Sequence, residues 1–123
     1  MINDSVLDLI GNTPMVDVSR LSPNPNVRIV AKLESQNPFG SVKDRIAKQM
    51  IEQAEKDGTL QPGQRILEPS SGNTGIALAA IAQMKGHPIT ILMHDSVSIE
   101  RRQMLLVFGA ELVLSLLHIS EPT

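Results

Sequence analysis

The chain has 123 residues, the length of one ordinary domain, which excludes a multi-domain protein within this sequence. Hydrophobic residues make up 41% and charged residues 20% of it, a balance that excludes a disordered tail or a membrane protein. The formal charge of −2 and the absence of Trp and Tyr argue against a nucleic-acid partner. Because there is no Cys, disulfides, thiolate zinc sites and a cysteine nucleophile are excluded.

The N-terminus and the histidines add two further expectations. Residues 1–4 lack the basic start and the apolar stretch of a secretion signal, and no apolar run approaches the roughly 20 residues that span a bilayer. We therefore expect a cytoplasmic location and no membrane contact. The three His residues are scattered without metal-ligand spacing, so we expect no metal site.

The first predicted elements are a loop and a strand. Two prolines within residues 22–26 forbid a helix there and predict a loop. Apolar residues then alternate along the chain, which predicts a strand with one apolar face. The apolar positions of this strand are Val27, Ile29, Ala31 and Leu33.

A helix is predicted after the turn at residues 37–40. Ser41 followed by Asp44 is a carboxylate variant of the capping box, so the helix is expected to begin there. Gly58 is placed to end it as a left-handed cap. The apolar positions, at three- and four-residue spacing, are Ile46, Ala47, Met50, Ile51 and Ala54.

The rest of the chain alternates between short apolar runs and helical segments. Strands are predicted at residues 65–68, 89–93 and 112–114, with helices at about 74–85 and 98–108. This β-α-β-α-β order predicts an α/β, doubly wound fold with a parallel sheet, right-handed crossovers and helices on the faces of the sheet. In such a sheet, ligands bind beyond the carboxyl ends of the strands.

The loop at residues 69–75 is a candidate binding site because it joins a predicted strand to a helix. Its small residues let a ligand approach the backbone, and the helix start offers free N–H groups for a carboxylate or phosphate. Alternatively, it is an ordinary turn in which Asn73 or Thr74 caps the helix. The loop has neither the Walker nor the GxGxxG spacing.

Lys43 is the second candidate. It falls in the first turn of a predicted helix, where the helix dipole disfavours a cation, and residues that break a local rule are candidates for function. A lysine held there is a potential nucleophilic amine. The alternative is a solvated lysine paired with Asp44 or a nearby Glu.

Two separated motifs together resemble a known family. Asn37-Pro-Phe-Gly-Ser-Val-Lys43-Asp-Arg45 and Glu68-Pro-Ser-Ser-Gly-Asn-Thr-Gly75 resemble the fold-type II pyridoxal-phosphate enzymes, in particular the cysteine synthase and cystathionine β-synthase group. Residues 11–14, 98–102 and 108–110 extend the resemblance from about residue 7 to residue 113. The departure is His94-Asp95, where the family pattern has Pro-Glu.

The resemblance implies a role for each residue of the motifs. Lys43 would form the Schiff base with pyridoxal 5'-phosphate and act as general base, and Asn73 would bind the ring hydroxyl of the cofactor. The residues that would bind the α-carboxylate of the substrate are Ser70, Ser71, Gly72, Asn73 and Thr74. The implied reaction is β-replacement on O-acetylserine or O-phosphoserine, with sulfide as the nucleophile of a cysteine synthase.

Alternatives from the same resemblance stay open. Homocysteine as nucleophile would make the enzyme a cystathionine β-synthase. A non-catalytic reading is an inactive fragment, or a module that binds a peptide carboxylate through residues 70–74. The expected partners are the amino-acid substrate and sulfide, a second copy in a homodimer, and serine acetyltransferase, whose tail docks in that pocket in the family.

The resemblance also implies that parts of the family structure are missing. The phosphate-binding loop and the late serine that meets the pyridine nitrogen have no counterpart, so the chain looks truncated and inactive alone. We expect residues 1–40 to belong to an absent larger domain, 41–113 to form part of an N-terminal α/β domain, and 114–123 to be a non-family tail. The strand near Leu114 is expected to expose apolar edges prone to association.

The remaining polar and sulfur-containing side chains are predicted to be structural. Arg101 and Arg102 are expected on a helix surface, and His87 and His94 in loops rather than in catalysis. The methionines expected to fill gaps in the core are Met84, Met93 and Met104.

Overall fold

The computed structural model describes residues 1–115, as helices, strands and connecting loops. The strands are β1 (Met15–Asp17), β2 (Val30–Lys32), β3 (Ile66–Glu68), β4 (Ile89–His94) and β5 (Glu111–Ser115). The α-helices are α1 (Lys43–Asp57), α2 (Asn73–Met84) and α3 (Ile99–Val107), and the 3₁₀ helices are η1 (Val6–Leu9), η2 (Ser19–Leu21) and η3 (Glu34–Gln36). No helix in this part of the chain has the length and apolarity to cross a bilayer.

The predicted β-α-β-α-β unit is confirmed. β3, β4 and β5 form a parallel sheet in that order, with Ile66 opposite Ile89 and Ile91 opposite Leu112. Two of these strands continue one residue beyond their predicted ends, since β4 includes His94 and β5 includes Ser115. Most of the predicted non-family tail, residues 116–123, lies outside the described residues.

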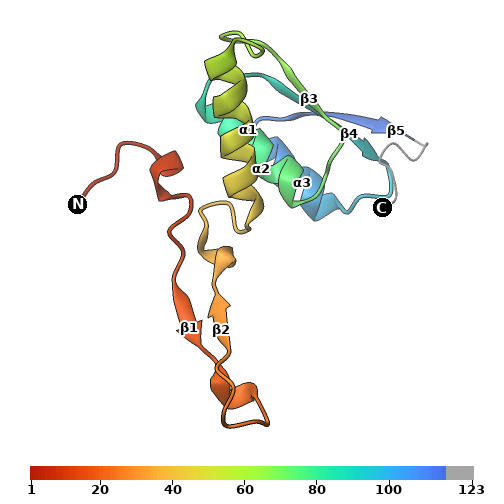
Figure 1. Cartoon of the computed structure of the whole chain (residues 1–123). Helices are drawn as coiled ribbons and strands as arrows, with labels where there is room; N and C mark the ends of the chain where they lie inside the picture. Colours follow the sequence, from red (N-terminus) through yellow and green to blue (C-terminus); the bar gives the residue numbers. More distant parts are fainter. Residues whose placement is uncertain (116–123) are drawn as a thin grey trace.

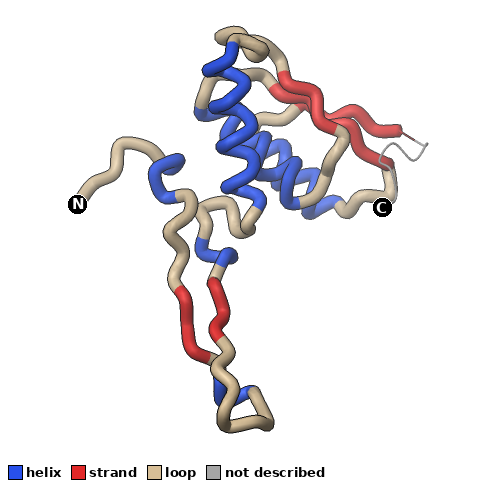
Figure 2. The backbone as a smooth tube through the Cα atoms, viewed as in Figure 1, coloured by secondary structure: helices blue, strands red, loops and turns tan. Residues whose placement is uncertain are grey.

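Helix α2 is the centre of the core. Every residue from Gly75 to Ala82 is buried, as its nearly continuous apolar sequence predicts. Helix α1 packs on one side of α2 and α3 on the other, and the strands lie beside them (Figures 1 and 2). The inward-facing residues Ile89, Ile91 and Met93 of β4 join the same apolar cluster, which closes the core against the sheet.

Only one face of the sheet is covered by the described helices. Along β4, the alternate residues Ile89, Ile91 and Met93 face the core and are nearly inaccessible. Leu67 of β3 and its register partner Thr90 of β4 lie on the face of the sheet that points away from the core. Leu67 is 63% exposed there. On β5, Val113 and Leu114 are also exposed, as predicted for this strand. The sheet therefore presents apolar side chains to solvent.

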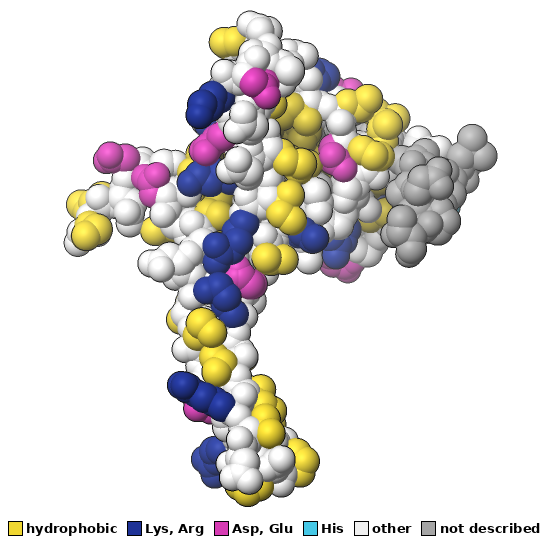
Figure 3. All heavy atoms as spheres, viewed as in Figure 1, with side chains coloured by type: hydrophobic (Ala, Val, Ile, Leu, Met, Phe, Trp, Pro, Cys, Tyr) yellow, Lys and Arg dark blue, Asp and Glu magenta, His cyan; other side chains and the backbone are white. Residues whose placement is uncertain are grey.

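The N-terminal third of the chain forms a hairpin that projects from the α/β body (Figure 1). β1 pairs antiparallel with β2, from Met15 opposite Lys32 to Asp17 opposite Val30. The predicted strand over residues 27–33 is wrong in extent, because only Val30–Lys32 pair with another strand. Its apolar face is not buried either, since Val27 and Ile29 are exposed. Space-filling atoms show apolar side chains on this arm (Figure 3).

The C-terminal end of α1 is fixed by Gly58 and by a buried histidine. Gly58 has the left-handed φ of 83° and its N–H bonds to the Glu55 carbonyl, which confirms the predicted cap. His87 lies in the predicted loop and is 2% exposed, with Nε2 at 2.8 Å from Glu55 Oε2 and Nδ1 at 3.0 Å from the Gln64 carbonyl. Because Lys85 pairs with the other oxygen of Glu55 at 2.9 Å, this cluster fastens α1 to the end of α2.

The methionines only partly follow their predicted role. Met93 is buried in the core as predicted. The prediction is wrong for Met84 and Met104, which are 46% and 49% exposed. Both lie on helix faces that point away from the apolar cluster, so they fill no gap in it.

Candidate functional site

The turn before α1 is held by Asp44. The predicted capping box is wrong, because the N-cap is Val42, which makes no side-chain cap bond, and the side chains of Ser41 and Asp44 do not bond each other's N–H groups. Asp44 Oδ2 instead accepts from the Phe39 N–H at 2.7 Å, and Ser41 Oγ accepts from the Lys43 N–H at 3.1 Å. Asp44 is fully buried and its Oδ1 has no hydrogen-bond partner among residues 1–115. Burial raises the pKa of this carboxyl.

A polar cluster ties the same turn to the N-terminal arm. Asn37 is buried, accepts from the Gly11 N–H at 2.8 Å and donates to the Glu34 carbonyl at 2.9 Å. The guanidinium of Arg45 bonds Glu34 at 2.6 Å, and Thr13 bonds both side chains. Arg45 holds the pKa of Glu34 at about 2. We call Thr13, Glu34, Asn37 and Arg45 the N-terminal clamp.

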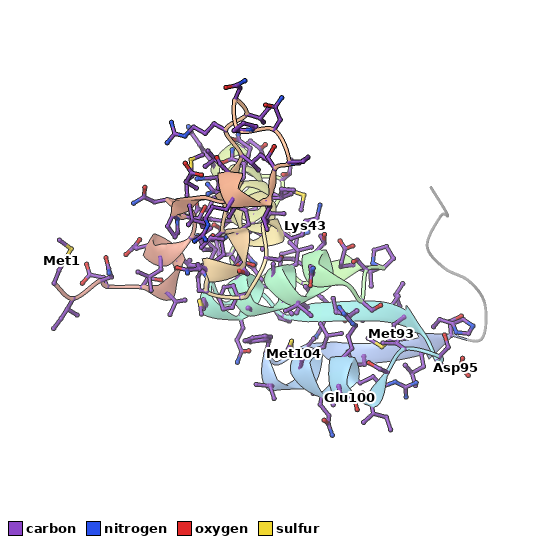
Figure 4. The ribbon with its side chains drawn as sticks, turned by 90° about the horizontal axis from the view of Figure 1, so that it is seen from below. Met1, Lys43, Met93, Asp95, Glu100 and Met104 are labelled. Carbon is purple, nitrogen blue, oxygen red and sulfur yellow. The ribbon has the colours of Figure 1, made fainter. Side chains whose placement is uncertain are left out.

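Lys43 is the first residue of α1 and lies in the sequence between Asn37 of the N-terminal clamp and Asp44. Its side chain is half-buried, and within residues 1–115 it makes no ion pair or hydrogen bond. The alternative of a lysine paired with Asp44 is wrong, because the Asp44 carboxylate is turned toward Phe39. Figure 4 shows Lys43 at the start of α1 and Glu100 and Met104 on α3, with α2 between the two helices.

The second candidate segment, which we call the binding loop, consists of Ser70–Thr74. It runs directly over the first turn of α2, and a Cβ built on Gly75 would lie 1.8 Å from the Ser70 carbonyl oxygen. Glycine is therefore required at position 75. The predicted capping role of Asn73 or Thr74 in the alternative is wrong, because Gly72 is the N-cap and no side chain of these two residues caps the helix.

The binding loop leaves backbone donors free. No carbonyl in the described part of the chain accepts from the N–H groups of Asn73, Thr74 or Gly75, at the positive end of the α2 dipole. Glu68, at the end of β3, bonds the Ser70 N–H, and burial raises the pKa of its carboxyl. Free amides at a helix start are suited to an anion, so the binding loop stays the candidate carboxylate or phosphate site.

A groove of about 310 Å³ is lined by one residue of each motif, Phe39 of the first and Asn73 of the second. The Phe39 ring packs edge-on against Phe108 at 5.6 Å between centroids, and Asn73 is exposed. Among the described residues, neither Lys43 nor Ser70, Ser71, Gly72 or Thr74 lines this groove. Its other lining residues are Ile76, Ser98, Glu100, Arg101 and Met104.

Arg101 and Arg102 lie on α3 as predicted and are partly exposed, whereas His94 does not lie in the predicted loop. The Nη1 of Arg101 donates to the Ser71 carbonyl at 3.1 Å. Arg102 bonds the carbonyls of Val97 and Asp95, so it closes the loop before its own helix. His94 is the last residue of β4 and bonds Ser96 Oγ at 2.7 Å.

Comparison with known proteins identifies the family. A family profile described as "Pyridoxal-phosphate dependent enzyme" matches residues 6–121. The chain belongs to this family. It is 53% identical over 105 residues to cysteine synthase B of Salmonella typhimurium, covering 85% of this chain and 35% of that protein.

Solved structures also match the fold. O-ureido-L-serine synthase superposes with a TM-score of 0.87 at 43% identity, over 94% of this chain and 36% of that one. A hydrogen sulfide-producing enzyme from Fusobacterium nucleatum gives 0.87 at 46% identity, over 93% and 37%. The chain thus spans about a third of the length of the relatives it matches, and over that third the predicted fold is confirmed.

The donors of this chain fit part of the cofactor that names the family. Pyridoxal phosphate carries an aldehyde, which needs a primary amine, and a ring hydroxyl, which needs a polar partner. Lys43 provides an amine with no competing partner in the described residues, and Asn73 provides an exposed amide on the groove beside the same turn. These two groups are chemically suited to the aldehyde and the hydroxyl.

Proposed function

We propose that this chain supplies the cofactor-binding lysine and the substrate-carboxylate loop of a cysteine synthase. The substrates of that enzyme would be an activated serine, O-acetylserine or O-phosphoserine, and sulfide. The observation that carries the proposal is that Phe39 of the Lys43 motif and Asn73 of the binding loop line the same groove. Cysteine synthases of Salmonella typhimurium and Staphylococcus aureus, at 53% and 47% identity, support this choice of reaction.

Lys43 would be both the attachment point and the general base. Pyridoxal phosphate, when bound, withdraws electrons from the substrate and makes its Cα proton acidic. The Lys43 amine takes that proton when the substrate has displaced it, and returns it when the product leaves. Asp44 and Arg45, the two residues after Lys43, hold the first turn of α1 in place for this step. Asp44 accepts from the Phe39 N–H, and Arg45 donates to Glu34.

The binding loop would hold the α-carboxylate of the substrate. Its free N–H groups, together with the hydroxyls of Ser70, Ser71 and Thr74, provide donors for two carboxylate oxygens. Gly72 lets the carboxylate approach the backbone. Asn73, on the groove, would bind the ring hydroxyl of the cofactor.

The rest of the proposed enzyme would lie outside this chain. We propose that residues 1–40 join a larger domain and residues 41–113 form part of the smaller one, so that this chain alone is inactive. The exposed apolar residues of the arm, including Met15 and Leu21, support this division, as does the uncovered face of the sheet at Leu67. In the intact enzyme we propose a homodimer whose binding loop also accepts the C-terminal carboxylate of serine acetyltransferase.

The test is where pyridoxal phosphate attaches. The chain is incubated with pyridoxal phosphate and reduced with borohydride, which fixes a pyridoxyl group on the amine that holds it, and the modified peptide is identified by mass spectrometry. We expect modification at Lys43 ahead of the other lysines, loss of that product in Lys43→Arg, and no change in the control Lys48→Arg, whose residue lies on the same helix. Equal labelling of all lysines contradicts the proposal.

A further inference from the structure

Arg101 is out of place on its own helix. It lies in the first turn of α3, after the N-cap Ser98, whose Oγ accepts from the Arg101 N–H. A cation there is opposed by the positive end of the helix dipole. The neighbouring Arg102 turns back to the Val97 and Asp95 carbonyls, so its contacts stay within its own loop. The stability of α3 therefore does not explain why an arginine stands at position 101.

The side chain of Arg101 reaches a different element. Its Nη1 donates to the Ser71 carbonyl, 30 residues away, at 3.1 Å. The other contacts of the binding loop are local, since Gly72 N–H donates to Ser70 Oγ at 3.3 Å and Ile76 N–H to the Gly72 carbonyl at 3.0 Å. In residues 1–115, no other hydrogen bond joins the binding loop to an element outside the β3–α2 segment.

This contact sets the orientation of a whole peptide unit. The carbonyl of Ser71 and the N–H of Gly72 belong to one planar trans peptide and point in opposite directions. A guanidinium that holds the carbonyl therefore also determines where the Gly72 N–H points, at the N-cap of α2. Because the hydrogen bond comes from a charged donor, it is stronger than the local contacts of the loop.

We propose that Arg101 is a positioning residue for the binding loop, which it holds in the conformation that receives a carboxylate. The ligand part of this inference rests on the proposed function. The mechanical part does not, because the Arg101–Ser71 bond joins two residues of this chain. Arg101 acts through the Ser71 carbonyl and is not placed on the reacting atoms.

The experiment compares two adjacent arginines. Arg101→Met removes the donors and keeps most of the stem, Arg101→Lys keeps one donor, and Arg102→Met is the matched control on the same helix. Amide hydrogen exchange at Gly72 and Ile76 is measured by NMR in the free full-length chain, and O-acetyl-L-serine and acetate are then titrated. We expect about tenfold faster exchange and about tenfold weaker binding in Arg101→Met, intermediate values in Arg101→Lys, and unchanged values in Arg102→Met.

The outcomes separate the two claims. Unchanged exchange in Arg101→Met, or an equal change in Arg102→Met, overturns the positioning role. If exchange is faster in Arg101→Met but the wild-type chain binds neither O-acetyl-L-serine nor acetate, the positioning role of Arg101 stands. The proposed function of the binding loop is then contradicted. If Arg101→Met does not fold, Arg101→Lys decides by the same exchange measurement, and wild-type exchange rates in it overturn the inference.

Discussion

Replacing Gly75 by Ala tests whether the binding loop lies against α2 as described. The new Cβ would lie 1.8 Å from the Ser70 carbonyl oxygen and 2.8 Å from its carbon. A carbon and an oxygen approach to about 3.3 Å, so the loop must retreat by roughly 1.5 Å. Overpacking against a side chain costs about 1–3 kcal/mol. Here the obstacle is backbone, which favours the upper end of that range, and Ala recovers about 1 kcal/mol of helix propensity, so we expect a net loss of about 2 kcal/mol.

The assay is urea unfolding followed by far-UV circular dichroism, with Gly72→Ala as the matched control. At Gly72 the nearest atom to a new Cβ is Ser70 Oγ at 3.8 Å, which is ordinary contact. Its φ of −83° suits Ala, so we expect the free energy of unfolding to change by less than about 1 kcal/mol. If Gly75→Ala is as stable as Gly72→Ala, or more stable, the described path of the loop over α2 is wrong.

Two further substitutions test the core and the N-terminal clamp. Ile81→Ala removes a fully buried side chain from α2 and should lower the free energy of unfolding in urea by about 2–5 kcal/mol. The control Met84→Ala, at an exposed position of the same helix, should change it by no more than about 0.5 kcal/mol. Equal losses would contradict the burial of Ile81. The pKa of Glu34, lowered from 4.5 to about 2 by Arg45, means that its contribution to stability is complete above pH 4.5 and is lost as the pH falls toward 2. Glu34→Gln should therefore flatten the loss of stability in that pH window, and an unchanged acid profile refutes the ion pair.

The sequence predicts those parts of the fold that depend on local pattern. Helix α1 follows from its three- and four-residue spacing and from Gly58, and the β-α-β-α-β order follows from short apolar runs separated by helices. β1 has no such signal, because it is three residues long and all of them are exposed. It exists through its pairing with β2, a contact that no local pattern records.

The same distinction applies to the candidate site. Lys43 stands out because the helix dipole disfavours a cation in the first turn of a helix. The binding loop stands out because it places small residues at a helix start, where the dipole favours an anion. The hydrogen bonds that hold them join residues far apart in the sequence, as from Arg101 to Ser71 or from Arg45 to Glu34. A cation in the first turn of α3 was a signal of the same kind as Lys43, and it could have drawn attention to Arg101.

The N-terminal clamp gives the projecting arm a mechanical connection to Lys43. Asn37, before the lysine in the chain, accepts from the Gly11 N–H, and Arg45, after it, donates to Glu34 and Thr13. The hairpin that projects from the α/β body (Figure 1) is therefore joined by hydrogen bonds to residues on both sides of Lys43, so a partner bound to the hairpin would be connected to the start of α1 through these few bonds.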